Sequence, residues 1–307
     1  MKKIIREFCA EFIAAFMLVV IGCGTAMATG AAVEESCGYI CVALAFGLSI
    51  CAIAYSVGNI SGGHANPAVS LGVLIKGGIT PVQFVYYVIA QVLGATAGSL
   101  ALITIYDGFS ADDMTYSYAT NAPIDVPNPI LFIILVECIA TFIFVMTVLG
   151  ATSKKHPHGE AGLAIAGTLA GLHLVTINLT GAAINPARFL GPALATQIIG
   201  EGDAMTYAVG YIAGPLLGGL LAGVIYRLLE GEDAKKEEKE EKAEEVKTDT
   251  AEKSEEEKES DGEMTKSLFE SEFGEEKKEE SEDEKASEEK KEESEDEKAS
   301  EDKKEEE

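Results

Sequence analysis

The chain has 307 residues, and its charges are divided unevenly at Glu230. Residues 1–230 carry 8 Lys and Arg against 13 Asp and Glu, a net charge of −5, whereas residues 231–307 carry 16 against 37, a net charge of −21. The first part has too few charges to cover the surface of a soluble domain, and the acidic balance excludes a basic nucleic-acid-binding protein.

The first long apolar stretch covers residues 12–33 and predicts a membrane-spanning helix. It contains no Asp, Glu, Lys or Arg, and it exceeds the ~20 residues that cross a bilayer as a helix. A cleaved signal peptide within residues 1–30 is the alternative, because the start is basic and small residues follow the apolar run. The length of the run and the position of Glu11 favour the spanning helix.

The next uncharged stretch, residues 36–75, is 40 residues long, which is too long for one span and too short for two. A single long tilted helix is opposed by Gly62-Gly63 and Pro67, which break helices. We therefore expect one full span followed by a half-helix. Residues 81–106 are again uncharged and predict the third span.

The second part of the membrane region repeats this order. Residues 130–151 predict a span that contains one charge, Glu137. Residues 161–200 contain only Arg188 and are broken at Thr180-Gly181 and Pro186, so they predict a span and a half-helix. Residues 204–226 predict the last span, giving an all-α membrane protein with six spans and two half-helices.

The loop charges predict the orientation in the cell membrane. With six spans, both termini and the loops near residues 76 and 152–160 share one side, which carries Lys2, Lys3, Arg6, Lys76, Lys154, Lys155 and Arg227. The other side is acidic, and Arg188 is its only cation. The positive-inside rule places both termini in the cytoplasm.

Two related halves, residues 4–106 and 130–229, form an internal repeat. The first spans share Glu11-Phe-Ile-Ala-Ala-Phe and Glu137-Cys-Ile-Ala-Thr-Phe, and each half later carries Asn-Pro-Ala, in Ser61-Gly-Gly-His-Ala-Asn-Pro-Ala and Thr180-Gly-Ala-Ala-Ile-Asn-Pro-Ala. Three spans per half invert the second half in the membrane. In such inverted repeats, broken helices at matching positions indicate the binding or conduction site.

The Asn-Pro-Ala boxes, residues 66–68 and 185–187, suit the starts of the two half-helices. Asparagine is a preferred N-cap and proline is preferred at the first helical position. Two half-helices that start at Asn66 and Asn185 would bring their positive dipole ends together near the bilayer midplane, which repels cations while the two amides donate hydrogen bonds to a neutral solute. The irregular backbone before each box offers carbonyl acceptors to a wet pore; the residues that we expect to supply them are Gly62, Gly63, His64, Ala65, Gly181, Ala183 and Ile184.

Over residues 4–229 the chain resembles the aquaporins of the major intrinsic protein superfamily. The resemblance is carried by Asn66-Pro67-Ala68, Asn185-Pro186-Ala187-Arg188, Glu11 and Glu137. It implies a passive water channel rather than an enzyme, with no cofactor and no metal. It further implies a homotetramer in the bilayer with one pore in each subunit.

The same resemblance implies which residues form the pore constriction. Matching local motifs gives Phe46, His173, Ala182 and Arg188. Two departures from the glycerol-conducting branch favour water: the chain has no Trp, and Phe189 rather than Asp follows the arginine. Ala182 is small and leaves passage of glycerol or other small neutral solutes as the alternative function. From the residues alone, Arg188 is also open to a reading as a helix-end arginine that reaches water, and His173 as a packing residue.

Glu11 and Glu137 have two interpretations. In the resembling family such glutamates accept hydrogen bonds from the loops and brace the half-helices, whereas buried carboxylates in pumps relay protons. A proton-coupled secondary transporter is therefore an alternative function, and a membrane scaffold for the acidic tail is another. The six cysteines are expected to be packing residues, because their spacing fits no metal site; they are Cys9, Cys23, Cys37, Cys41, Cys51 and Cys138.

Residues 231–307 are expected to be a disordered cytoplasmic tail of low complexity. Of 77 residues 53 are charged, and the segment 276–288 recurs unchanged at 289–301. Such a segment lacks the apolar residues needed to offset the entropy of ordering. Met264–Phe273 is its one apolar cluster and a candidate binding motif, for a partner that the sequence does not identify.

Overall fold

The computed structural model describes residues 1–29, 38–109, 118–153 and 160–231, and Met1–Gly231 forms one compact unit. Its elements in chain order are α1 (Lys2–Thr29), α2 (Gly38–Ser56), α3 (Gly58–Ser61), α4 (Pro67–Lys76), α5 (Pro81–Phe109), α6 (Pro129–Ala151), α7 (Ala161–Thr180), α8 (Pro186–Ile199), the 3₁₀ helix η2 (Ala204–Tyr207) and α9 (Ala208–Leu229). The described residues are otherwise loops, without a strand.

The expected six spans and two half-helices are present. In the described part of the chain, α1, α2, α5, α6, α7 and the segment from η2 to α9 are long and apolar enough to cross a membrane. The half-helices are α4 and α8, with 10 and 14 residues. Two local details differ from expectation: α1 already begins at Lys2 rather than near Phe12, and the short helix α3 occupies part of the expected break.

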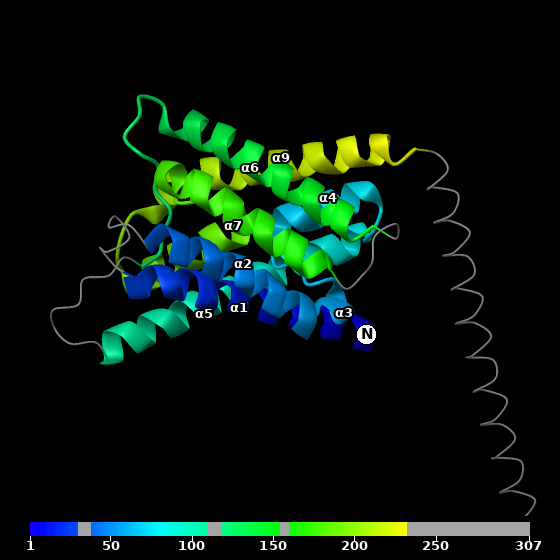
Figure 1. The fold of residues 1–307 in the computed structure, drawn as a ribbon. Helices are drawn as coiled ribbons and strands as arrows, with labels where there is room; N and C mark the ends of the chain where they lie inside the picture. Colours follow the sequence, from blue (N-terminus) through cyan, green and yellow to red (C-terminus); the bar gives the residue numbers. More distant parts are fainter. Residues whose placement is uncertain (30–37, 110–117, 154–159, 232–307) are drawn as a thin grey trace, which may run out of the picture. The chain divides into compact units, whose positions relative to one another are not determined.

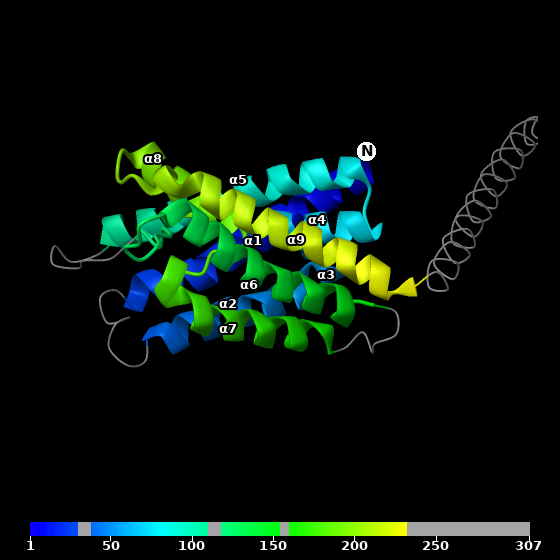
Figure 2. The ribbon, with the colours of Figure 1, turned by 90° about the horizontal axis from the view of Figure 1, so that it is seen from above.

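The two halves interlock through their half-helices. Figures 1 and 2 show the long helices side by side, with α4 toward the end of the bundle where the N-terminus lies and α8 toward the opposite end. Within the halves, α1 packs on α5 and α6 packs on α9. Between the halves, α4 packs on α9 and α8 packs on α5, so each half-helix is supported by the third span of the other repeat.

Glycines allow these helices to approach backbone to backbone. A Cβ on Gly94 of α5 would lie 2.1 Å from the carbonyl oxygen of Phe12 in α1, and one on Gly218 of α9 would lie 2.4 Å from that of Cys138 in α6. Gly219 makes the same kind of contact with the half-helix, 2.3 Å from the carbonyl oxygen of Ala68. Small residues at helix crossings are the usual means of close packing in a membrane.

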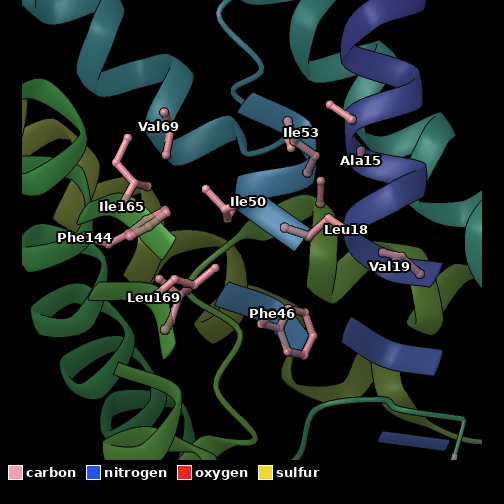
Figure 3. Close-up of a cluster of buried hydrophobic side chains, with 14 of the residues drawn as sticks. Ala15, Leu18, Val19, Phe46, Ile50, Ile53, Val69, Phe144, Ile165 and Leu169 are labelled. Atoms are coloured by element: carbon pink, nitrogen blue, oxygen red, sulfur yellow. The ribbon is translucent and has the colours of Figure 1, made fainter. Parts of the chain in front are cut away.

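The apolar core is built from several helices around the centre of the bundle. Figure 3 shows Leu18 of α1, Ile50 of α2, Phe144 of α6 and Leu169 of α7 within one cluster of buried side chains. The opposite faces of the long helices leave large aliphatic side chains exposed, as expected for helices that face lipid or another subunit.

Some sequence expectations fall outside the described residues. These concern the tail, with its repeat and the Met264–Phe273 cluster, the loop cations Lys154 and Lys155, and Cys37.

Candidate functional site

Each half-helix begins at the asparagine of its Asn-Pro-Ala box. Asn66 and Asn185 have extended backbone angles, and the prolines that follow occupy the first helical positions. The Oδ1 atom of Asn66 accepts from the N–H of Ala68 at 2.8 Å, and that of Asn185 accepts from the N–H of Ala187 at 2.9 Å. Both boxes therefore act as the N-caps that the sequence predicts.

The two boxes are also joined across the repeat. Nδ2 of Asn66 donates to the carbonyl oxygen of Ile184 at 3.0 Å, and Nδ2 of Asn185 donates to that of Ala65 at 2.8 Å. Each amide thus uses one of its two N–H groups to hold the opposite loop, and these bonds leave its second N–H uncommitted. The sequence predicted that the two amides are donors, and it did not predict this reciprocal contact between the loops.

The loops before the boxes have matching, unusual backbones. The residues with positive φ fall at the same three positions of each loop, and they are Gly62, Gly63, Ala65, Gly181, Ala182 and Ile184. For alanine and isoleucine this region is strained. Such a backbone persists only where surrounding contacts hold it.

Glu11 supplies those contacts in the first loop. The carboxylate is fully buried and accepts from the N–H of His64 and the N–H of Ala65, each at 2.9 Å. It also accepts from Oγ of Ser61 at 2.6 Å and from Nε2 of Gln91 at 2.7 Å. Four donors match the acceptor capacity of an ionised carboxylate.

Glu137 makes the equivalent contacts in the second loop. It is fully buried and accepts from the N–H groups of Ala183 and Ile184, at 3.0 and 2.6 Å, and from Oγ1 of Thr180 at 2.6 Å. Both glutamates therefore bind the strained residues directly. This geometry agrees with the bracing interpretation of the sequence.

Three of the four expected constriction residues lie together. The rings of Phe46 and His173 stack with centroids 4.3 Å apart, and the guanidinium carbon of Arg188 lies 5.1 Å from the centroid of the Phe46 ring. All three line a cavity that also reaches Asn66 and Asn185. The other residues on its wall are Leu18, Ile50, His64, Phe144, Leu169 and Ala183.

The fourth, Ala182, is fully buried, and the wall of this cavity includes its neighbour Ala183 instead. Three of the backbone carbonyls expected to face the pore accept hydrogen bonds from protein side chains. The carbonyl of Ala65 accepts from Asn185, and the carbonyl of Ile184 accepts from Asn66. The carbonyl of Gly181 accepts from Nδ2 of Asn121 at 2.8 Å.

Two polar atoms on the cavity wall have no hydrogen-bond partner in the described part of the chain. They are Nε2 of His173 and Nε of Arg188, and both are buried. Nδ1 of His173 lies 2.9 Å from the carbonyl oxygen of Leu169, which has no hydrogen to give, so Nδ1 carries the proton. In the neutral ring, Nε2 is then an acceptor, while the Nε–H of Arg188 is a donor.

Sequence reasoning missed Asn121, which holds the arginine in place. Nη1 of Arg188 donates to Oδ1 of Asn121 at 2.5 Å and to the carbonyl oxygen of Ala119 at 3.0 Å. Asn121 is almost fully buried in the connection before α6. An Asn in a polar connecting segment has no pattern that distinguishes it from turn residues, so this role follows only from the fold.

Comparison with known proteins agrees with this geometry. A sequence model described as "Major intrinsic protein" matches residues 1–226. Aquaporin Z of Brucella melitensis is 42% identical over 194 residues, which cover 62% of this chain and 84% of the relative. Aquaporin Z of Rhodopseudomonas palustris is 41% identical over 194 residues, which cover 62% of this chain and 80% of the relative.

The chain therefore belongs to the major intrinsic protein family. Among solved structures, the aquaglyceroporin from Plasmodium falciparum has the same fold, with a TM-score of 0.63 and 23% sequence identity. The match covers 74% of this chain and 95% of that one.

Proposed function

We propose that residues 1–230 form a passive channel, not an enzyme, which conducts water down its gradient. The observation that carries the proposal is the pair of unpartnered polar atoms, Nε2 of His173 and Nε of Arg188, on the cavity that reaches both Asn-Pro-Ala boxes. Buried polar atoms are nearly always hydrogen-bonded to protein or to water. One acceptor and one donor from residues on the same cavity suit a water molecule, which both donates and accepts.

The asparagine amides of the two boxes are the next polar groups along the proposed path. Asn66 and Asn185 each retain one N–H, and they cap half-helices whose positive ends meet from opposite sides. A neutral solute accepts hydrogen bonds there, whereas a cation or a proton is repelled by the dipoles and by the charge of Arg188. Glu11 and Glu137, in this proposal, brace the loops and take no part in proton transfer.

Water is favoured over larger solutes because the stacked rings of Phe46 and His173 and the guanidinium of Arg188 share the same part of the cavity. Relatives that are about 40% identical carry the name aquaporin. Conduction of glycerol or another small neutral solute is the second candidate. It is favoured by the small side chain of Ala183 on the cavity wall, whereas Ala182, on which the sequence-based alternative rested, lies off that wall.

The proposal includes the orientation of the channel in the membrane, its assembly and its tail. The basic residues Lys2, Lys3, Arg6, Lys76 and Arg227 would face the cytoplasm in the cell membrane, with both termini on that side. Figure 1 supports a shared side, since the N-terminus and the end of α9 lie at the same end of the bundle. The assembly would be a homotetramer, with exposed aliphatic faces meeting lipid and neighbouring subunits, and residues 231–307 would be a separate acidic tail.

Stopped-flow light scattering on reconstituted vesicles tests the proposal, first with an impermeant osmolyte to measure water flux and then with a glycerol gradient. We expect fast water flux, no glycerol flux above that of empty vesicles, and no added proton flux in vesicles loaded with a pH dye. Glycerol flux would favour the second candidate. Water flux no faster than in empty vesicles, from correctly folded protein, would refute the channel, and a proton current would refute the dipole barrier.

A further inference from the structure

The repeat is asymmetric around His64, next to the first Asn-Pro-Ala box. His64 lines the cavity, and its Nδ1 lies 3.0 Å from Oγ of Ser70, which in turn accepts from Nε2 of Gln91 at 3.0 Å. Counted from the two boxes, the positions that match His64 and Ser70 are occupied by Ala183 and Phe189. In the third spans, Gly94 and Gly218 meet the equivalent residues Phe12 and Cys138, and this pairing matches Gln91 with Pro215. The backbone contacts of Glu11 and Glu137 are common to both halves, whereas the link from Gln91 through Ser70 to His64 has equivalent side chains in the first half alone.

With the Glu11 carboxylate ionised, as its four donors indicate, counting hydrogens gives the direction of every bond in the chain. The amide nitrogen of Gln91 faces the Glu11 carboxylate at 2.7 Å, and an ionised carboxylate only accepts. The second hydrogen of that nitrogen goes to Oγ of Ser70. Ser70 is fully buried, and Nδ1 of His64 is the one acceptor that the described residues offer to its hydroxyl hydrogen.

The opposite arrangement, with a proton on Nδ1 of His64, would leave the Ser70 hydroxyl hydrogen buried and unpaired, which is unfavourable because a buried donor without an acceptor has lost its bond to water. Nδ1 of His64 is therefore an acceptor, and the neutral ring carries its proton on Nε2. His173 has the reverse tautomer, because its Nδ1 donates to the carbonyl of Leu169.

We propose that Gln91 and Ser70 are positioning residues that make His64 a hydrogen-bond donor to the solute in the cavity. The proposal rests on the channel function given above. It adds which hydrogen-bond role a water molecule takes at each of the two histidines. A water molecule at His64 must accept a hydrogen bond, whereas a water molecule at Nε2 of His173 must donate one. The donor at His64 also extends the donor surface formed by the two asparagine amides on the α4 side of the boxes.

Solid-state NMR of the full-length protein in lipid bilayers tests the tautomer directly. With ¹⁵N- and ¹³C-labelled histidine, correlation to Cδ2 identifies Nε2, because Cδ2 is bonded to that nitrogen alone, and the loss of one signal in His64→Gln assigns His64. We expect the proton on Nε2 of His64 and on Nδ1 of His173. A proton on Nδ1 of His64 in the unmodified protein would overturn the proposal.

Variants test the role of the serine. In Ser70→Ala, Nδ1 of His64 loses its donor, so we expect the single tautomer to become a mixture in which N–H signals come from both nitrogens. Ser70→Thr keeps the hydroxyl and should restore the single tautomer. Ser99→Ala is the matched control, because Ser99 is equally buried but bonds only to the carbonyl of Ala95 in its own helix. An unchanged tautomer in Ser70→Ala would overturn the assigned role of Ser70.

The NMR signals do not depend on water flux. A protein with the expected tautomers that fails to conduct water would contradict the channel function, and a conducting protein with the wrong tautomer would contradict this inference alone.

Discussion

Gly219 offers a way to move one half-helix without changing a pore residue. It lies in α9 where that helix crosses α4, and the Cβ of an alanine there would lie 2.3 Å from the carbonyl oxygen of Ala68 and 3.0 Å from its carbonyl carbon. Both contacts involve backbone, which cannot rotate aside as a side chain can. The two helices would have to separate by roughly 1 Å to reach ordinary van der Waals contact.

The consequence for the pore follows from the position of Ala68, two residues after Asn66. A shift of roughly 1 Å would stretch the 3.0 Å bond from Nδ2 of Asn66 to the carbonyl of Ile184 beyond hydrogen-bond range. Overpacking costs about 1–3 kcal/mol and the lost bond about 1 kcal/mol more. The same shift is roughly a third of the diameter of a water molecule, so we expect Gly219→Ala to lower water permeability at least tenfold.

Stopped-flow permeability, normalised to the amount of reconstituted protein, and thermal unfolding in detergent measure the two effects. Gly171→Ala in α7 is the matched control, since a Cβ there meets no atom within 4 Å. It should leave both quantities unchanged. If Gly219→Ala conducted water and unfolded like the parent, the proposed backbone contact between α9 and α4 would not position the box.

Three further substitutions address the constriction. Phe46→Ala combined with His173→Gly removes the stacked rings, so glycerol should enter vesicles at least tenfold faster while water flux persists; unchanged glycerol exclusion would mean that these rings do not limit the pore. Ala183→Cys, at a position on the cavity wall, should make water flux sensitive to a mercurial to which the parent is insensitive, whereas Ala182→Cys, at a buried position off that wall, should not. An Ala183→Cys protein that carries mercury yet conducts normally would show that Ala183 does not line the path. Asn121→Ala removes one of the two acceptors that the described residues offer to the Arg188 guanidinium, so water flux should change several-fold and thermal stability should fall by about 1–3 kcal/mol, because a buried donor loses its partner. Flux equal to that of the parent would exclude a positioning role.

Local chemistry explains why much of the architecture was predictable from the sequence. Length and lack of charge determine which segments span a bilayer, and the six spans and their order are confirmed. The starts of the half-helices were equally accessible, because an asparagine followed by proline encodes an N-cap within two residues. The start of α1 was missed because charged residues at its N-terminal end extend the helix beyond its apolar part.

Contacts between distant residues were decided only by the tertiary structure. The bond from Asn66 to the carbonyl of Ile184 joins residues 118 positions apart, and nothing in the Asn-Pro-Ala pattern reveals that one N–H of each amide is already engaged. Asn121 reaches Arg188 across 67 positions from a connecting segment without a motif.

The glycines show the same limit. Gly171 and Gly219 are both glycines in apolar helices, yet one faces open space and the other touches the backbone of a half-helix. A sequence specifies which residues are small, apolar or able to cap a helix, because these properties belong to each residue and its neighbours. Which of them meet depends on how the helices cross, and the crossing is set by the packing of the whole bundle.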